Sequence, residues 1–187
     1  KNKAKAARRA RARAEKKNMD PVDPLDQMYS RGSALITCGH GAEAVPLIRQ
    51  AAERGHVGAI GSLASIYHQG WYGVEKDTAK GVELYLEAGR KGDDKAQYAL
   101  GRLYYDGSDG FPEDHVKAVE YFQKGVALGH AASHFHLGHA YMHGEGGLAI
   151  DEAKAVELYR NAASLGHDNF AAIPDALLHL AVYHQQK

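Results

Sequence analysis

The chain has 187 residues with an ordinary apolar fraction of 44%, which suffices for one globular or repeat domain and excludes two large domains. Its formal net charge is zero, and its one cysteine, Cys38, excludes an internal disulfide and any cysteine-based structural zinc site. No run approaches 18 apolar residues, so no membrane span is predicted, and the cysteine usage favours an intracellular, reducing compartment without distinguishing cytosol from mitochondrion.

Residues 1–24 are predicted to form a basic arm and a proline-bearing linker, ahead of a folded domain at 25–187. Residues 1–17 contain one anion, Glu15, and nine cations, which we call the arm cations: Lys1, Lys3, Lys5, Arg8, Arg9, Arg11, Arg13, Lys16 and Lys17. The rest of the chain has 14 cations and 22 anions, a net charge of −8. Three interpretations of the arm stay open: a targeting remnant, a solvated tail, or an arm that binds an acidic partner such as RNA with release of counterions.

A first pair of helices is predicted directly after the arm. Its first helix is expected from Leu25 to Ile36, and its second between Gly41 and Gly55. Apolar residues at helical spacing are expected to point inward from the second helix: Val45, Ile48, Ala51 and Ala52.

An internal repeat of 37 residues follows. Blocks 56–92, 93–129 and 130–166 align without a gap, and nine columns are identical in all three. The columns are Leu63/Leu100/Leu137, Tyr67/Tyr104/Tyr141, Gly70/Gly107/Gly144, Gly73/Gly110/Gly147, Asp77/Asp114/Asp151, Lys80/Lys117/Lys154, Val82/Val119/Val156, Glu83/Glu120/Glu157 and Gly92/Gly129/Gly166. A fixed period of this length is typical of stacked helical repeats.

Each block is predicted to contain an A helix, a loop and a B helix. In block 93–129 the A helix shows an apolar stripe and ends near Gly107, because glycine adopts the positive φ of a helix C-terminus. Asp114 is expected to cap the B helix, which should bury the stripe Val116, Val119, Phe122 and Val126. The apolar loop residues Val74, Phe111 and Leu148 should tuck each loop under its helices, and the recurring tyrosines, with Tyr85, Phe122 and Tyr159, should be packing residues.

One helix pair cannot bury both of its stripes alone, so neighbouring pairs must stack. We therefore predict an all-α fold, an α-solenoid of about four helix-loop-helix repeats. A capping helix is expected after Pro174, through Ala176, Leu177, Leu180, Ala181 and Tyr183.

The repeated string resembles the Sel1-like repeat, a relative of the tetratricopeptide repeat. Leu100–Gly101 to Tyr104, Leu137–Gly138 to Tyr141, Lys117–Ala118 and Lys154–Ala155 carry the likeness, which spans about residues 28 to 187. The first full block has Ala64 and Gly81 where glycine and alanine are usual, a small-for-small exchange that should not break packing. The resemblance implies adaptors and scaffolds that hold other proteins together and perform no chemistry of their own.

Candidate chemistry is sparse. No nucleophile elbow, zinc-protease string or P-loop occurs, so neither an enzyme nor a cofactor is expected. His136, His139 and His143 share one helix face and would suit a divalent metal, although the same columns elsewhere suggest a solvated face. His130 and His167 are expected to start helices. Candidate partner-binding residues are the arm cations, the loop aromatics Trp71 and Tyr72, Arg102 and those three histidines.

The sequence therefore favours a non-enzymatic structural or adaptor subunit of a larger assembly. Its solenoid would contact other protein subunits, and its arm would anchor on an acidic partner. The alternative is an accessory protein of a ribosome or other ribonucleoprotein with the arm on RNA, and a weaker alternative is a histidine-dependent metal-binding protein.

Overall fold

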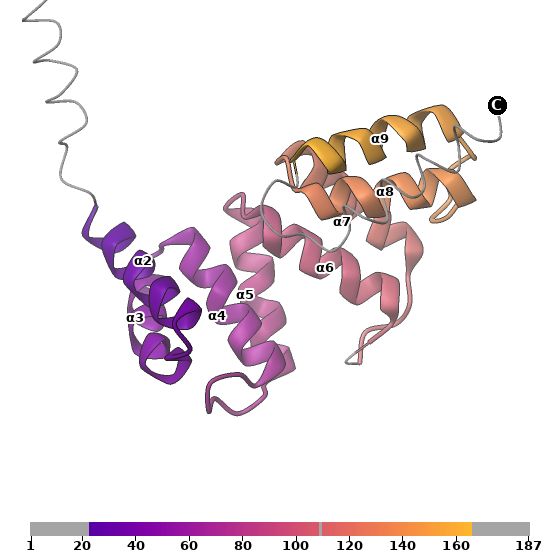
Figure 1. The fold of residues 1–187 in the computed structure, drawn as a ribbon. Helices are drawn as coiled ribbons and strands as arrows, with labels where there is room; N and C mark the ends of the chain where they lie inside the picture. The colour runs from indigo at the N-terminus through magenta and orange to yellow at the C-terminus, as the bar shows by residue number, and fades with distance from the viewer. Residues whose placement is uncertain (1–22, 109, 166–187) are drawn as a thin grey trace, which may run out of the picture.

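Four pairs of antiparallel helices stack side by side in the computed structural model, which describes residues 23–108 and 110–165 (Figure 1). The A helices are α2, α4, α6 and α8, and the B helices are α3, α5, α7 and α9. Their bounds are α2 Pro24–Thr37, α3 Gly41–Glu53, α4 Val57–Gln69, α5 Thr78–Arg90, α6 Asp94–Asp106, α7 His115–Ala127, α8 Ala131–His143 and α9 Glu152–Leu165. The described part contains no strand, and the closest packing joins helices that are consecutive in the chain. The all-α solenoid is confirmed.

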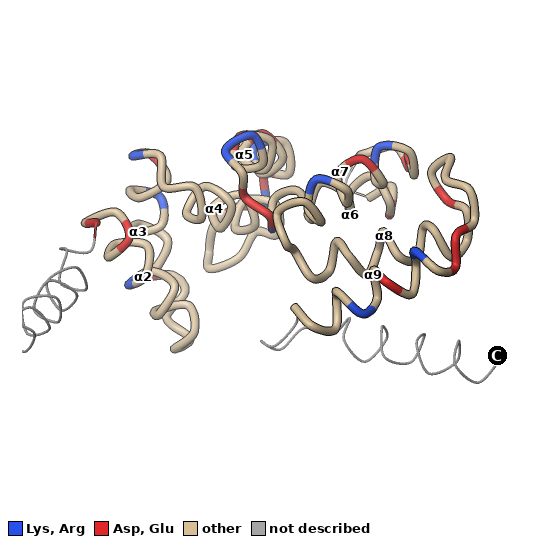
Figure 2. Tube along the Cα trace, turned by 90° about the horizontal axis from the view of Figure 1, so that it is seen from above, with Lys and Arg blue, Asp and Glu red and all other residues tan. Residues whose placement is uncertain are grey.

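Lysine, arginine, aspartate and glutamate residues are spread over the other helices, whereas α4 and α8 contain none, as Figure 2 shows from a second direction. Within residues 23–108 and 110–165, no helix is both long and apolar enough to cross a bilayer. The predicted arm, the residues His167 and Gly166 and the capping helix after Pro174 lie outside the described residues.

The repeated glycines end the A helices, as predicted. Gly70, Gly107 and Gly144 are the left-handed C-caps of α4, α6 and α8, with φ of 72°, 57° and 70°. Residues other than glycine rarely adopt positive φ, which explains why this position is glycine in all three blocks.

The repeated Tyr, Asp and Lys columns close each loop, and we call each set a latch. Asp114 caps α7 by accepting a hydrogen bond from the backbone N–H of Lys117 at 3.0 Å, while its own N–H donates to the carbonyl of Tyr104 at 2.8 Å. The ammonium group of Lys117 lies 5.1 Å from the centre of the Tyr104 ring, a cation–π distance. The same contacts recur as Tyr67–Asp77–Lys80 and Tyr141–Asp151–Lys154.

The interior consists of small and branched apolar side chains. Leu100, Leu103, Val119 and Phe122 are buried, and the second helix of the first pair buries all four residues expected of it. The prediction that Val116 belongs to the buried stripe is wrong. Its side chain is 55% exposed because it lies on the first turn of α7, outside that stripe.

The aromatic columns divide into two kinds. Tyr85, Phe122 and Tyr159 are buried, as predicted. The recurring tyrosines of the latches are only half-buried, packed against the core on one side and covered by lysine on the other. The loop residues Val74, Phe111 and Leu148 also pack partly buried against the core.

Candidate functional site

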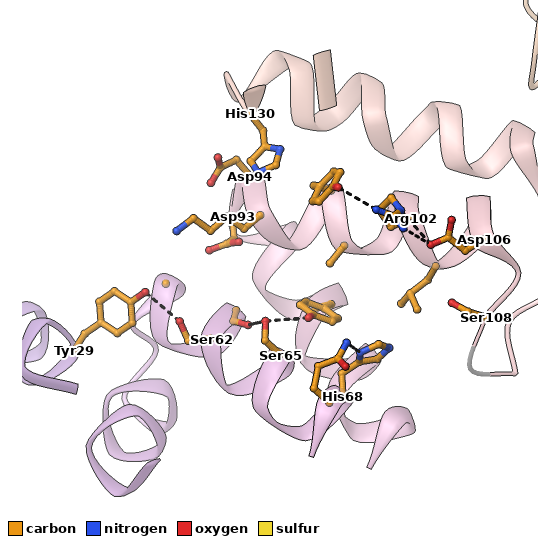
Figure 3. Close-up of a pocket in the computed structure, with 18 residues that line it drawn as sticks. Tyr29, Ser62, Ser65, His68, Asp93, Asp94, Arg102, Asp106, Ser108 and His130 are labelled. Atoms are coloured by element: carbon orange, nitrogen blue, oxygen red, sulfur yellow. Dashed lines mark hydrogen bonds and ion pairs between the residues drawn. The ribbon is translucent and has the colours of Figure 1, made fainter. Parts of the chain in front are cut away.

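A groove of about 730 Å³ runs along the A helices from Tyr29 on α2, across α4 and α6, to His130 at the start of α8 (Figure 3). Its lining on α4 is small over the first two turns, at Gly58, Gly61, Ser62 and Ser65, and ends in the larger His68 and Gln69. Side chains of this size leave space between the helices, which larger residues would fill.

The repeat columns explain why the groove opens at α4. The position of Gly61 is Tyr98 on α6 and Phe135 on α8, and the position of Ser62 is His136 on α8. None of these α8 residues lines the groove. The hollow is therefore a local departure from the repeat, produced by small residues on α4.

Tyrosines and serines supply polar groups along the groove. The hydroxyls of Tyr29 and Ser62 are 3.1 Å apart, and the hydroxyl of Tyr85 donates to Ser65 at 2.9 Å. Burial of the Tyr85 side chain is the main reason that its pKa is raised. These hydroxyls retain further hydrogen-bonding capacity, which suits a ligand with its own donors and acceptors.

Carboxylates and one guanidinium group set the charge of the groove. Arg102 donates to Asp106 at 2.6 and 3.1 Å and to the hydroxyl of Tyr98 at 3.3 Å. Asp93 caps α6 by accepting from the backbone N–H of Ala96 at 2.7 Å. Burial is the main cause that raises the pKa of Asp93, and the neighbouring charge of Asp94 raises it further.

His136 is not on a solvated face, which corrects the sequence interpretation. Its ring stacks on Phe122 at 5.0 Å between centroids, and Tyr98 and Tyr105 lie at 5.6 and 5.9 Å. Burial, followed by the positive charge of Arg102, lowers the pKa of His136 to about 4.

The other two histidines of that face do not complete a metal site with it. The ring of His139 lies 4.3 Å from that of His143 and 3.4 Å from the carboxylate of Glu145. Across the described parts of the chain, no group of three or more potential ligands is placed to hold a metal ion. His130 does start a helix, as expected: its Nδ1 accepts from the backbone N–H of Ser133 at 3.3 Å.

The loop aromatics differ from each other. Trp71 is 49% exposed, as predicted. Tyr72 is only half-buried rather than exposed, since its ring covers Gly41 at the start of α3 and leaves no room there for a Cβ atom. Of the candidate partner-binding residues, Arg102 alone lines the groove within the part of the chain that the structure describes.

Sequence reasoning missed most of the groove. Tyr29, Ser62, Tyr85, Asp93 and Tyr98 were not among the candidates, although all of them line it. The available indication was the small Gly61, whose column carries an aromatic ring in both other blocks, next to Ser62, whose column carries one only at His136.

Comparisons with known proteins agree with this architecture. The sequence profile of the Sel1 repeat matches residues 59–93, 94–130 and 131–167. A Sel1 repeat protein from Oxalobacter formigenes is similar in structure, with a TM-score of 0.66 and 26% identity over 79% of this chain and 62% of that one. The protective antigen c5321 from uropathogenic Escherichia coli has a TM-score of 0.67 and 24% identity, over 87% of this chain and 34% of its own.

A third structure, cysteine rich protein B from Helicobacter pylori, has a TM-score of 0.52 and 21% identity over 70% of this chain and 92% of that protein. At 24% and 21% identity, the second and third structures support the fold alone. The chain spans less than two thirds of the length of the first two. No curated protein sequence matches the chain.

Proposed function

Because the chain belongs to the Sel1 repeat family, whose members generally mediate contacts between proteins, we propose that it is a non-enzymatic adaptor or structural subunit of a larger assembly. The groove along α4 and α6 would hold an extended segment of a partner protein. The observation that carries this proposal is the hollow itself, which opens beside Gly61, a position that holds an aromatic ring in both other repeats.

The lining of the groove suits a peptide. Residues from α2, α4, α5 and α6 contribute, so the site is elongated across several helices rather than centred on one reacting group. Hydroxyls of Tyr29, Ser62 and Ser65 can exchange hydrogen bonds with a peptide backbone, while the tyrosine rings offer apolar area.

Filling the groove tests the proposal. Ser62→Trp should abolish capture of partner proteins, because the indole would occupy the space that the partner needs. Ser164→Trp is the matched control, since Ser164 is exposed at the far end of α9. Affinity capture with both variants, each checked for helical circular dichroism, makes the comparison. Equal capture by both variants would exclude the groove as the binding site.

The arm supports a second candidate, an accessory role on RNA. Nine cations against one anion in residues 1–17 give a strongly positive segment, whereas the rest of the chain at −8 would repel nucleic acid. The affinity for a single-stranded oligonucleotide should then fall with salt, with a logarithmic slope of up to roughly six.

The matched variant for this test replaces all nine arm cations by Gln, and we call it the neutral-arm variant. It should lose most of the salt-dependent slope. If the wild-type chain binds no oligonucleotide at low salt, the RNA candidate fails and the arm must anchor on another acidic surface.

A further inference from the structure

One end of the groove is acidic. Asp93 and Asp94 lie together at the start of α6, close to His130 (Figure 3). Neither carboxylate has an ion pair within 4 Å among the described residues, whereas Arg102, farther along, is neutralised by Asp106. Lys95 also lines the groove, with an exposed side chain, and its positive charge offsets only part of the effect that Asp94 has on the Asp93 carboxylate.

The surroundings of Asp93 disfavour the charged form of its carboxylate. Its side chain is half-buried, and its carboxylate lies 3.1 to 3.2 Å from the point where a Cβ atom on Gly61 would stand. Burial and the charge of Asp94 raise its pKa, which means that its charged form is less stable here than in water. A cation brought to this point would stabilise the charged carboxylate by direct attraction and would offset the repulsion from Asp94.

The aromatic walls of the groove suit the stem of a long cationic side chain. Tyr29 and Tyr98 both line the groove, as Asp93 and Asp94 do. The chain already uses this chemistry elsewhere, because Lys80 and Lys154 lie 4.3 and 4.2 Å from the centres of tyrosine rings.

We propose that the groove selects an extended partner segment carrying a lysine or arginine, whose charged end meets Asp93 and Asp94. This inference rests on the proposed function, since it names the chemistry of the segment that the groove would bind. Asp93 and Asp94 thereby become specificity-determining residues, with Tyr29 and Tyr98 flanking the stem.

A labelled synthetic peptide with the sequence of residues 3–13 is the probe, because it carries lysines and arginines spaced by alanine. Two further peptides replace its cations by Gln or by Glu. Fluorescence polarisation at 0.15 M salt measures their affinity for the full chain and for the neutral-arm variant. We expect the cationic probe to bind and the other two peptides to bind at least roughly tenfold more weakly.

Two pairs of substitutions locate the binding. Asp93→Asn with Asp94→Asn should weaken the cationic probe roughly tenfold or more, and asparagine keeps the cap on α6. Glu83→Gln with Glu120→Gln removes the same charge from exposed positions on the B helices and should leave affinity within about twofold. Equal losses in the two pairs would mean general attraction to an acidic surface and would overturn the inference.

The remaining outcomes are also decisive. If the Gln peptide binds as tightly as the cationic one and Ser62→Trp abolishes both, the groove binds segments without charge selection, so the inference fails and the proposed function stands. Tighter binding to the neutral-arm variant that Asp93→Asn with Asp94→Asn abolishes would support cation selection and would identify residues 1–17 as a competing occupant, whereas a gain that persists in those substitutions would mean general attraction and would overturn the inference. Absence of cationic-probe binding to both forms of the chain overturns the inference.

Discussion

His136 is the histidine whose ionisation the fold changes most. Its neutral imidazole lies among Phe122, Tyr98 and Tyr105, and the positive charge of Arg102 lies nearby. In an unfolded chain the same ring has a pKa near 6.5, against about 4 in the fold. The unfolded state therefore binds a proton between these two values while the folded state does not.

Because the unfolded state binds this proton more readily, acid should favour unfolding. Lowering the pH from 7 to 4 should destabilise the wild-type chain by about 1–3 kcal/mol more than His136→Phe, which keeps an aromatic ring against Phe122 without a titrating nitrogen. Urea unfolding at several pH values measures the difference. The loss should begin below pH 6.5 and level off near the folded pKa. Parallel pH profiles of the two proteins would show that the imidazole is solvated.

Tyr104 illustrates a residue whose role the sequence predicts only in part. A fully buried tyrosine would cost roughly 3–5 kcal/mol on replacement by alanine. The structure instead places Tyr104 half-buried between Tyr121, stacked at 5.7 Å, and Phe111 at 5.4 Å, with Lys117 over its ring.

We therefore expect Tyr104→Ala to lower the free energy of unfolding by about 2–3 kcal/mol, below the cost for full burial. Chemical denaturation measures the change. Phe122→Ala, at a fully buried ring in the same repeat, serves as the reference and should cost more, about 3–5 kcal/mol. A loss at Tyr104 within about 0.5 kcal/mol would place its ring on the surface.

At the scale of the element, the first full repeat packs its two helices differently from the others. Gly101 and Gly138 on the A helices face the rings of Phe122 and Tyr159, where an added Cβ would lie 2.6 and 3.0 Å from ring atoms. In the first block that position is Ala64. The glycine stands on the B helix instead, where a Cβ on Gly81 would approach the backbone nitrogen of His68 at 2.9 Å. In the first block, glycine therefore lies on the B-helix side of the contact between the two helices, and alanine lies on the A-helix side.

This exchange predicts a coupling between the two positions. Gly81→Ala alone should destabilise the chain by about 1–3 kcal/mol through overpacking against α4. Adding Ala64→Gly restores the arrangement of the other repeats and should recover at least about 0.5 kcal/mol of that loss. A double-mutant cycle from urea unfolding gives the coupling, and strict additivity would show that the two sites are independent.

At the scale of the whole molecule, each helix packs chiefly against its neighbours in sequence. Stability in such an array is close to a sum of local terms, so one end can open while the other stays folded. Ile48 on α3 is fully buried, and it belongs to the end that begins with α2.

Ile48→Ala should therefore act locally. A loss of about 2–5 kcal/mol in the first helix pair is expected to speed amide hydrogen exchange in α2 and α3 and to leave α8 and α9 nearly unchanged. Exchange measured by mass spectrometry resolves the helices separately. Uniform acceleration across all of them would indicate one cooperative unit instead.

The period of 37 predicted the helix pairs, their glycine ends and their aspartate caps, because these depend on contacts within one repeat. It did not predict the groove, because the groove depends on positions where one repeat has a small side chain and the next has a large one. His136 was misjudged for a related reason: its burial comes from rings on α6 and α7, which a single helix face cannot reveal. The exposure of Val116 depends likewise on where its helix starts.

Each latch of tyrosine, aspartate and lysine lies wholly inside its own 37-residue unit. Gene duplication or deletion of one unit would therefore leave every other loop closed, since no latch borrows a residue from its neighbour. The length of the solenoid can therefore change between related genes in steps of one helix pair. A tandem copy of residues 93–129 would extend the row of A helices by one helix pair without any redesign of the units already present.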